Sequence, residues 1–259
     1  MNKITLSLLE KIYLATFPST SGAKNTYPIS HYIDIFNYVL KTGIAWRDIR
    51  APLHWSTYYK KFKKWVDHDI FLILYKSVLS LSIQKSLLNP DNLKTLFIDS
   101  TMIKNFKGID LLGKNHYDRH RYGNKVTIIV ASNGIPISVS LATANTHDLS
   151  QVIPAINNIP IKIIRSKLIA DKGYISNNIK IQLKKNNNIR FIYPYKKTQK
   201  KSNTKMELKL LKQRYIVENT FSWLQNYRRI RIRYDKQSNT FLQFYYFAMA
   251  NLICKKIDK

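Results

Sequence analysis

The chain has 259 residues, of which 45% are hydrophobic and 12% aromatic, so it can bury a core and is not an intrinsically disordered chain. Its 43 Lys and Arg residues against 15 Asp and Glu give a formal net charge of +28, which attracts polyanions and makes nucleic acid the expected partner. The alternative is a solvated basic surface on a protein whose substrate is not DNA.

Cys254 is the only cysteine, which excludes an internal disulfide and a cysteine-based zinc site and fits a reducing compartment. No stretch approaches the roughly 18 to 20 apolar residues that a membrane span needs. The segment from Met1 to Phe17 lacks the apolar block of a signal peptide. We therefore expect a cytoplasmic, nucleoid-associated protein with no membrane partner.

Residues 1 to about 90 carry helical patterning, with Thr42-Gly43 ending one helix and Ser56 as a candidate cap of another. In the helix after Ser56, one face would be apolar and the other basic. The apolar face is Tyr59, Phe62 and Val66, and the basic face is Lys60, Lys61, Lys63 and Lys64. This pattern predicts a small all-α, DNA-binding domain over residues 1–90, although an ordinary amphipathic helix with a solvated lysine face would look the same.

Asn89-Pro90-Asp91 interrupts the chain, and β-rich runs follow it. Strands are predicted at 93–99, 125–131, 135–143, 163–170 and 189–195, and helices at 148–158, 177–185, 206–227 and 237–256. Ser132-Asn133-Gly134 joins the second and third strands as a hairpin turn. The alternation predicts an α/β domain over 91–259 with a mixed five-stranded sheet flanked by helices.

Two predicted strands end in a carboxylate, Asp99 and Asp171, at the edge where α/β sheets gather ligands. Glu218 and Arg214 are four residues apart and so share one face of the 206–227 helix. Beside them lies an apolar stripe that would dock this helix on the sheet, namely Leu210, Val217, Phe221 and Leu224. Taken singly, each acid has a simpler reading, as a helix cap or as a surface ion pair.

Together the boxes FIDST, GNKVTIIVASNGIPISVSLATANTHD, ADKGY and RYIVENTFSWLQNYRRIRIRYDK resemble the DDE transposases of bacterial insertion sequences. The likeness is closest to the IS-five group within the IS-four-like assemblage. The upstream segments GIAWRDI and WSTYYKKFKKW are also similar to that group, so the resemblance spans about Gly43 to Lys256.

The resemblance implies an RNase H-like catalytic domain in which Asp99, Asp171 and Glu218 bind two Mg²⁺ ions, with Mn²⁺ as a substitute. It also implies metal-dependent cleavage of double-stranded DNA at element ends, strand transfer into target DNA, and a dimer in the synaptic complex. The chemistry agrees, because clustered carboxylates repel unless cations are present, and Mg²⁺ prefers oxygen ligands. Two such ions can activate the attacking oxygen and stabilise the departing one.

The helix that carries Glu218 departs from the family pattern, with Leu211 at the usual Tyr position and Gln225 at the usual Lys position. Arg214 matches and is expected to contact phosphate. Charge missing at Gln225 could come from basic residues further along, namely Arg228, Arg229 or Lys236.

Residues near the second Asp are also DNA-binding candidates. Lys172 is expected to contact DNA, and Tyr174 either stacks on a flipped or terminal base or packs under the strand end. In the pair His147-Asp148, capping by Asp148 is a simpler reading than metal binding. The basic loop with His116 and His120 is a candidate phosphate contact. The run Lys196, Lys197, Lys200 and Lys201 is either a non-specific contact to the DNA backbone or a disordered loop.

Two rival functions stay open. The first is an RNase H-like nuclease that cleaves DNA without joining it. The second is a catalytically decayed transposase that still binds DNA, against which the intact acid triad argues.

Overall fold

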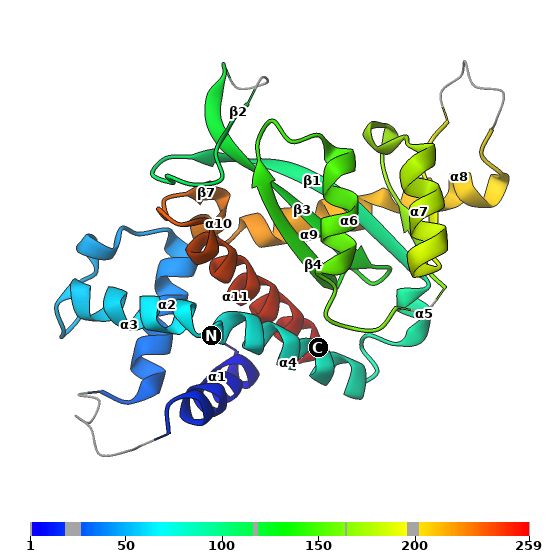
Figure 1. Cartoon of the computed structure of the whole chain (residues 1–259). Coiled ribbons are helices and arrows are strands. Elements are labelled where there is room, and N and C mark those ends of the chain that lie inside the picture. Colours follow the sequence, from blue (N-terminus) through cyan, green and yellow to red (C-terminus); the bar gives the residue numbers. More distant parts are fainter. Residues whose placement is uncertain (1, 19–26, 116–118, 164, 196–201, 259) are drawn as a thin grey trace. The chain divides into compact units, whose positions relative to one another are not determined.

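The computed structural model describes residues 2–18, 27–115, 119–163, 165–195 and 202–258. The chain divides into two compact units (Figure 1). The first unit comprises Met1–Lys85, Phe106–Asp110 and Trp223–Lys259, and the second comprises Ser86–Asn105 and Leu111–Ser222. The division predicted at residue 90 assigned the last helix to the second domain, whereas the structure groups it with the N-terminal helices.

The first unit is mainly helical. Its elements are α1 (Lys3–Thr16), α2 (Ile29–Thr42), η1 (Trp46–Asp48), α3 (Trp55–Asp67), α4 (Ile70–Gln84), α10 (Arg228–Arg231), β7 (Ile232–Arg233) and α11 (Ser238–Ile257). Gly43 ends α2 as predicted, in the left-handed conformation at φ 70° that glycine adopts without strain. None of the helices in the described ranges is long and apolar enough to cross a membrane.

Helix α11 explains why the two ends of the chain fold together. It is buried along most of its length, so it needs apolar neighbours on several sides. The ring of Phe244 stacks on Phe62 with centroids 4.6 Å apart, and the ring of Phe247 lies 5.0 Å from that of Phe71. The C-terminal helix therefore completes the core of the N-terminal helices.

In α3, the prediction of a helix with opposite apolar and basic faces is correct, and Phe62 and Val66 are buried as predicted, but Tyr59 was assigned to the apolar face wrongly. Tyr58, not Tyr59, is fully buried, and its hydroxyl lies 2.9 Å from the His31 ring nitrogen. Tyr59 is 37% exposed. The helix begins at Trp55 without a side-chain cap, so the cap expected from Ser56 is absent from this helix.

The second unit is built on a mixed sheet. Its strands are β1 (Thr95–Asn105), β2 (Gly113–Asn115), β3 (Arg121–Ala131), β4 (Pro136–Thr143), β5 (Lys167–Ile169) and β6 (Arg190–Ile192). The order is β4-β3-β1-β5-β6, with β2 pairing with the start of β3. The first three of these strands are antiparallel neighbours, and β5 and β6 run parallel to β1. All five predicted strands are present, and β2 was not predicted.

Helices lie on both faces of this sheet. They are α5 (Pro90–Leu93), η2 (Asp148–Gln151), α6 (Val152–Asn157), η3 (Lys172–Tyr174), α7 (Asn177–Asn187), α8 (Lys205–Leu211), η4 (Lys212–Arg214) and α9 (Tyr215–Gln225). In Figure 1, α6 and α7 lie in front of the strands and α9 passes behind them.

Two helix predictions in this unit need correction. The continuous helix expected at 206–227 is broken, because a 3₁₀ turn separates α8 from α9 just before Glu218. The cap expected from Asp148 is also wrong, since His147 is the N-cap residue of η2 and its ring nitrogen accepts the N–H of Leu149. Asp148 is instead paired with a buried lysine.

Candidate active site

The register of two parallel strands places Asp99 and Asp171 at equivalent positions. The last residue pair between β1 and β5 is Phe97 with Ile169, and each carboxylate lies two residues beyond its member of that pair. Side chains two residues apart on a strand share a face. The two acids therefore follow Phe97 and Ile169 at the point where the parallel pairing ends.

The strand predicted to end at Asp99 is longer in the structure. The strand continues through Asn105, because the residues after Asp99 keep their antiparallel pairing with β3, from Asp99 opposite Ile128 to Lys104 opposite Gly123. What ends at Asp99 is the pairing with β5, not the strand. A ligand could still bind beside Asp99, because β1 and β5 stop pairing there and leave space between them.

Three carboxylates surround the guanidinium of Arg214. Its Nη2 lies 3.4 Å from Asp99 Oδ2 and 3.9 Å from Glu218 Oε1, and its Nη1 lies 3.4 Å from Asp171 Oδ1. We call Asp99, Asp171, Glu218 and Arg214 the carboxylate cluster. The structure thus brings together all four residues that the sequence singled out.

The contacts of Arg214 in the cluster are long, and one of its nitrogen atoms has no partner. All three contacts are longer than the roughly 2.7–2.9 Å of a strong charge-assisted hydrogen bond. Arg214 Nε is buried and has no hydrogen-bond partner in the described part of the chain. Asp171 and Glu218 are about half exposed, so an incoming ligand can reach them.

The pKa of Asp99 reflects the opposing charges around it. Burial raises the pKa of its carboxyl group above the ordinary value, and the carboxylates of Asp171 and Glu218 act in the same direction. The backbone N–H of Ser100 and the Arg214 guanidinium oppose this rise. A cation brought to this position would favour the ionised carboxylates.

The buried side chain of Tyr174 connects the turn after Asp171 to the strand that carries Asp99. It is 1% exposed, and its hydroxyl lies 2.7 Å from Ser100 Oγ, which in turn lies 2.7 Å from Thr127 Oγ1. This chain of hydroxyls ties the turn after Asp171 to β1 and β3. The proposal that Tyr174 stacks on a base is wrong for this conformation, because its ring has no exposed face, and the alternative of packing under the strand end is correct.

Helix α9 holds Glu218 through a buried neighbouring face. Val217 is fully buried, and Thr220 donates its hydroxyl to the Gly134 carbonyl at 3.2 Å, in the turn between β3 and β4. Residues 217, 220 and 221 dock the helix on the sheet, whereas Glu218 points away from that buried face and is 57% exposed. Leu210, predicted to extend this stripe, lies before the 3₁₀ break and is only half-buried.

Sequence reasoning missed a charged pair next to the cluster. Lys125 is buried, and its ammonium lies 2.6 Å from Asp148 Oδ1 and donates to the Thr146 carbonyl. Asp148 raises the pKa of Tyr174, as does Asp99, but the effect of burial is larger. The signal that could have revealed this pair is a lysine within an otherwise apolar strand, because a buried charge needs a partner.

The structure changes the roles of several predicted DNA contacts. Arg229 is 3% exposed and forms a two-pronged pair with Asp235 at 2.7 and 3.1 Å, so its predicted DNA contact is wrong. The reason is burial, since no surface of its guanidinium remains for phosphate. Arg228 and Lys172 are exposed and stay candidates.

The four lysines of α3 are not equivalent. The Lys61 ammonium lies 4.1 Å from the Tyr32 ring centre, the Lys64 ammonium lies 4.4 Å from that of Phe17, and Lys63 pairs with Asp67 at 2.7 Å. Lys60 is exposed and forms no ion pair or cation–π contact within the ranges that the structure describes. His116 and the lysines at 196–201 lie outside those ranges.

The donor types of the cluster fit a hard divalent cation, but the side chains as they stand do not enclose one. Across the described residues, no three His, Cys, Asp or Glu side chains are gathered closely enough to hold a metal ion. In the carboxylate cluster, the Arg214 guanidinium is the cation among the three acids. The orphaned Nε and the long contacts indicate that this guanidinium is not locked in place.

A sheet of three antiparallel strands followed by two parallel ones, with carboxylates beside β1 and β5, defines the RNase H-like class of α/β domains. Residues 91–253 match the family of transposase DDE domains. Because this match covers more than half of the chain, the chain belongs to that family.

One curated protein and one solved structure are similar to this chain. The putative transposase for insertion sequence element IS402 of Burkholderia cepacia is 33% identical over 135 residues, which cover 49% of this chain and 61% of that protein. The match thus spans about three fifths of that relative's length. The structure of piggyBac transposase in a synaptic complex with hairpin DNA has a TM-score of 0.51 at 10% identity, covering 99% of this chain and 72% of that one. At this identity the second likeness concerns the fold alone.

Proposed function

We propose that this protein is an insertion-sequence transposase that cleaves DNA at element ends and transfers the strand into target DNA. The observation that carries the proposal is the convergence of Asp99, Asp171 and Glu218 on one guanidinium within 4 Å. Membership in the transposase DDE family and the basic charge of the chain support the same activity.

We further propose that Asp99, Asp171 and Glu218 would hold two Mg²⁺ ions, for which Mn²⁺ substitutes. When bound, the ions would lower the pKa of the attacking water or hydroxyl and stabilise charge on the leaving oxygen. Carboxylate oxygens are suitable ligands for Mg²⁺. Burial raises the pKa of Asp99, and a bound cation would oppose that rise by favouring the ionised carboxylate.

In this proposal Arg214 binds a phosphate of the DNA. A guanidinium that already makes three long contacts can exchange them for two parallel hydrogen bonds to a phosphate. The exposed Lys172 and Arg228 would add phosphate contacts, and Lys60, with Lys61, Lys63 and Lys64 around it, would bind the element ends. Tyr174 and Ser100 keep the Asp171 turn against β1.

The partners follow from the chemistry. Bringing two element ends together needs at least two copies of the chain, so we propose a dimer in the synaptic complex on double-stranded DNA. Such a protein would act in the cytoplasm, on the nucleoid.

The test is a cleavage assay on DNA that carries the element ends. The variants Asp99→Asn, Asp171→Asn and Glu218→Gln should each abolish cleavage while leaving end binding largely intact. Asp91→Asn, which removes an exposed carboxylate outside the cluster, is the matched control. Persistent cleavage in any of the three cluster variants would show that the site is assigned wrongly.

A second assay separates transposition from plain hydrolysis. Pre-cleaved ends with a free 3′-hydroxyl should be joined to a target plasmid by the parent protein. Cleavage without joining would favour a nuclease, and binding without either reaction would favour a decayed transposase.

A further inference from the structure

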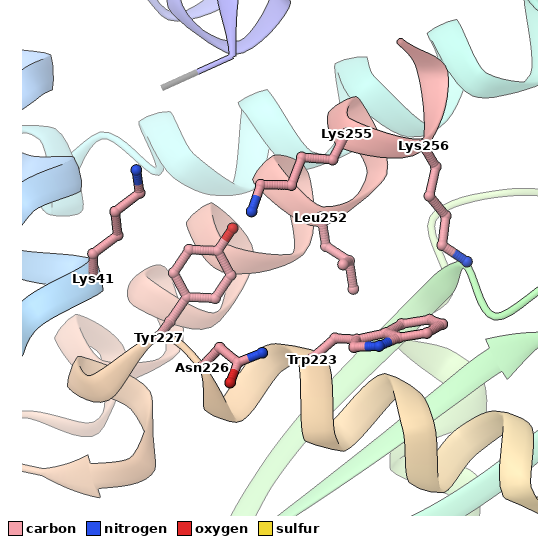
Figure 2. Close-up of a pocket in the computed structure, with 7 residues that line it drawn as sticks. All are labelled: Lys41, Trp223, Asn226, Tyr227, Leu252, Lys255 and Lys256. Carbon is pink, nitrogen blue, oxygen red and sulfur yellow. The ribbon is translucent and has the colours of Figure 1, made fainter. Parts of the chain in front are cut away.

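The first unit contains a cavity outside the carboxylate cluster. Its volume is about 490 Å³, within the range of roughly 300–1,000 Å³ that is usual for small-molecule sites. The lining residues are Lys41, Trp223, Asn226, Tyr227, Leu252, Lys255 and Lys256 (Figure 2). They come from α2, from the end of α9 and the residues after it, and from α11.

A second cavity of about 290 Å³ shares Lys41, Tyr227 and Lys255 with the first. It adds three asparagines, Asn2, Asn37 and Asn251. Since three residues line both, the two cavities are neighbours. We call them together the lysine–tryptophan pocket.

Three residues that line this pocket carry buried polar atoms without hydrogen-bond partners. Tyr227 Oη, Asn251 Nδ2 and Asn37 Oδ1 are all buried and make no hydrogen bond in the described structure. The three residues are 4–6% exposed. Buried polar groups are nearly always paired in native proteins, so three unpaired ones in one pocket indicate a missing partner with both donors and acceptors.

The charges of the lining residues favour an anion. Three of the seven residues around the larger cavity are lysines, and among the residues that the structure describes no acidic one lines either cavity. Figure 2 shows the end of the Lys255 side chain close to the Tyr227 hydroxyl. Burial raises the pKa of Tyr227 to about 12, so its hydroxyl keeps its proton and can donate a hydrogen bond.

The pocket also offers an aromatic platform. Trp223 is 41% exposed, and the Lys256 ammonium lies 4.9 Å from the centre of its ring. Leu252 extends the apolar wall on the α11 side. A flat aromatic group stacked on the indole would lie beside the Lys256 ammonium.

We propose that the lysine–tryptophan pocket binds one unpaired nucleotide, with its base on Trp223 and its phosphate between Lys41 and Lys255. The unpartnered Tyr227, Asn251 and Asn37 atoms provide the donors and the acceptor for the polar edges of the base and sugar. An unpaired nucleotide is required because a base stacked in a duplex has no free face for the indole. This proposal does not depend on cleavage by the carboxylate cluster.

Photocrosslinking of the full chain locates the site directly. The probe is a 5′-phosphorylated single-stranded tetranucleotide that carries one 5-iodouracil, and mass spectrometry identifies the crosslinked peptide. We expect the crosslink at Trp223 or Tyr227. A fully paired duplex with the same iodouracil inside should not crosslink there, and a crosslink confined to other peptides would overturn the proposal.

Binding measurements test the platform. Fluorescence anisotropy with a labelled tetranucleotide should show affinity loss of about 5- to 100-fold for Trp223→Ala, the usual range for a lost stacking contact. Trp223→Phe should retain affinity within about threefold, since a ring remains. Tyr38→Ala removes an aromatic of similar exposure from α2, 48% against 41% for Trp223, and is the matched control. Equal losses in Trp223→Ala and Tyr38→Ala would contradict the platform.

The charges are tested in the same way. The double variant Lys41→Gln and Lys255→Gln should weaken binding about tenfold and lower the salt slope by about 0.7, the contribution of the one phosphate contact that is lost on a single strand. Lys76→Gln with Lys85→Gln removes two exposed charges of the same unit and should leave crosslinking at the pocket unchanged. Identical behaviour of the two double variants would overturn the phosphate assignment.

Competition distinguishes the source of the nucleotide. Displacement of the crosslink by free deoxynucleoside monophosphate would make the pocket a free-nucleotide site, whereas displacement only by unlabelled tetranucleotide would assign it to a DNA strand. Equal competition by inorganic phosphate alone would contradict recognition of the base. Thermal unfolding of each variant confirms that a loss of binding is not a loss of fold.

Discussion

Two arginines from one basic segment of the sequence, Arg214 and Arg229, differ in their burial and in the contacts they make. Arg229 is buried in the first unit and holds Asp235 with two contacts of 2.7 and 3.1 Å. Arg214 is in the second unit and spreads over three carboxylates at 3.4–3.9 Å, with Nε unpaired. A saturated pair of short contacts stabilises the fold. Long, shared contacts beside exposed acids leave the guanidinium able to change partner.

The largest loss of stability should come from breaking the Arg229–Asp235 pair. Arg229→Gln leaves Asp235 buried without its cation and should lower the free energy of unfolding by about 3–5 kcal/mol, the usual cost of removing one partner of a buried pair. Chemical denaturation measures the loss. Arg228→Gln is the control, because its exposed side chain should cost little. Similar stability of the two variants would mean that burial does not separate these arginines.

Breaking the unsaturated cluster should affect activity rather than stability. Arg214→Gln should reduce cleavage about 100-fold, as for the loss of a donor to a reacting phosphate group. Its free energy of unfolding should change by less than about 1 kcal/mol, because no short pair is lost. The two numbers come from a cleavage assay and a denaturation curve. A large stability loss with normal cleavage would assign Arg214 the structural role of Arg229.

The raised pKa of Asp99 predicts a pH-dependent effect. A carboxyl group whose pKa is higher in the folded than in the unfolded state binds protons more tightly when folded, so folding weakens as the pH rises through that window. In metal-free buffer, Asp99→Asn should therefore be more stable than the parent at neutral pH. The difference should vanish below the ordinary pKa of aspartate, about 3.9. A constant difference from low to neutral pH would contradict the sign.

The smallest expected effect is a difference between Lys60 and Lys63 of α3 in the salt dependence of DNA binding. Lys60→Gln should lower the salt slope of DNA-end binding by about 0.9, the contribution of one phosphate contact on a duplex. Lys63→Gln should change the slope less, because Lys63 already pairs with Asp67. Filter binding at several salt concentrations gives both slopes. Equal slopes would show that the Lys63 pair opens on DNA.

Local sequence signals predicted much of the second unit. The Asn133-Gly134 turn is present, with Gly134 at φ 74°, a conformation that glycine adopts freely. Strand β4 and helix α11 begin and end within one residue of their predicted bounds. These features depend on nearby residues, which is why a single sequence can reveal them.

Features that depend on distant partners were predicted less well. The pattern around Ser56 could not tell whether Tyr58 or Tyr59 is buried, since the answer depends on His31 and the rest of the core. Likewise Arg228 and Arg229 are adjacent and chemically identical, and only Asp235 and the surrounding rings distinguish the buried one. Strand β2 is too short to have a periodic signal of its own.

The sequence by itself determined the residue types of the candidate site, because Asp99, Asp171, Arg214 and Glu218 each belong to a recognisable segment with its own periodicity. Only the tertiary structure decided how they meet. The β1–β5 register sets the two aspartates at equivalent positions, and Thr220 anchors α9 on the hairpin turn. Side-chain distances depend on strand pairing and helix docking between segments far apart in the chain, and a pattern along one strand carries no information about either.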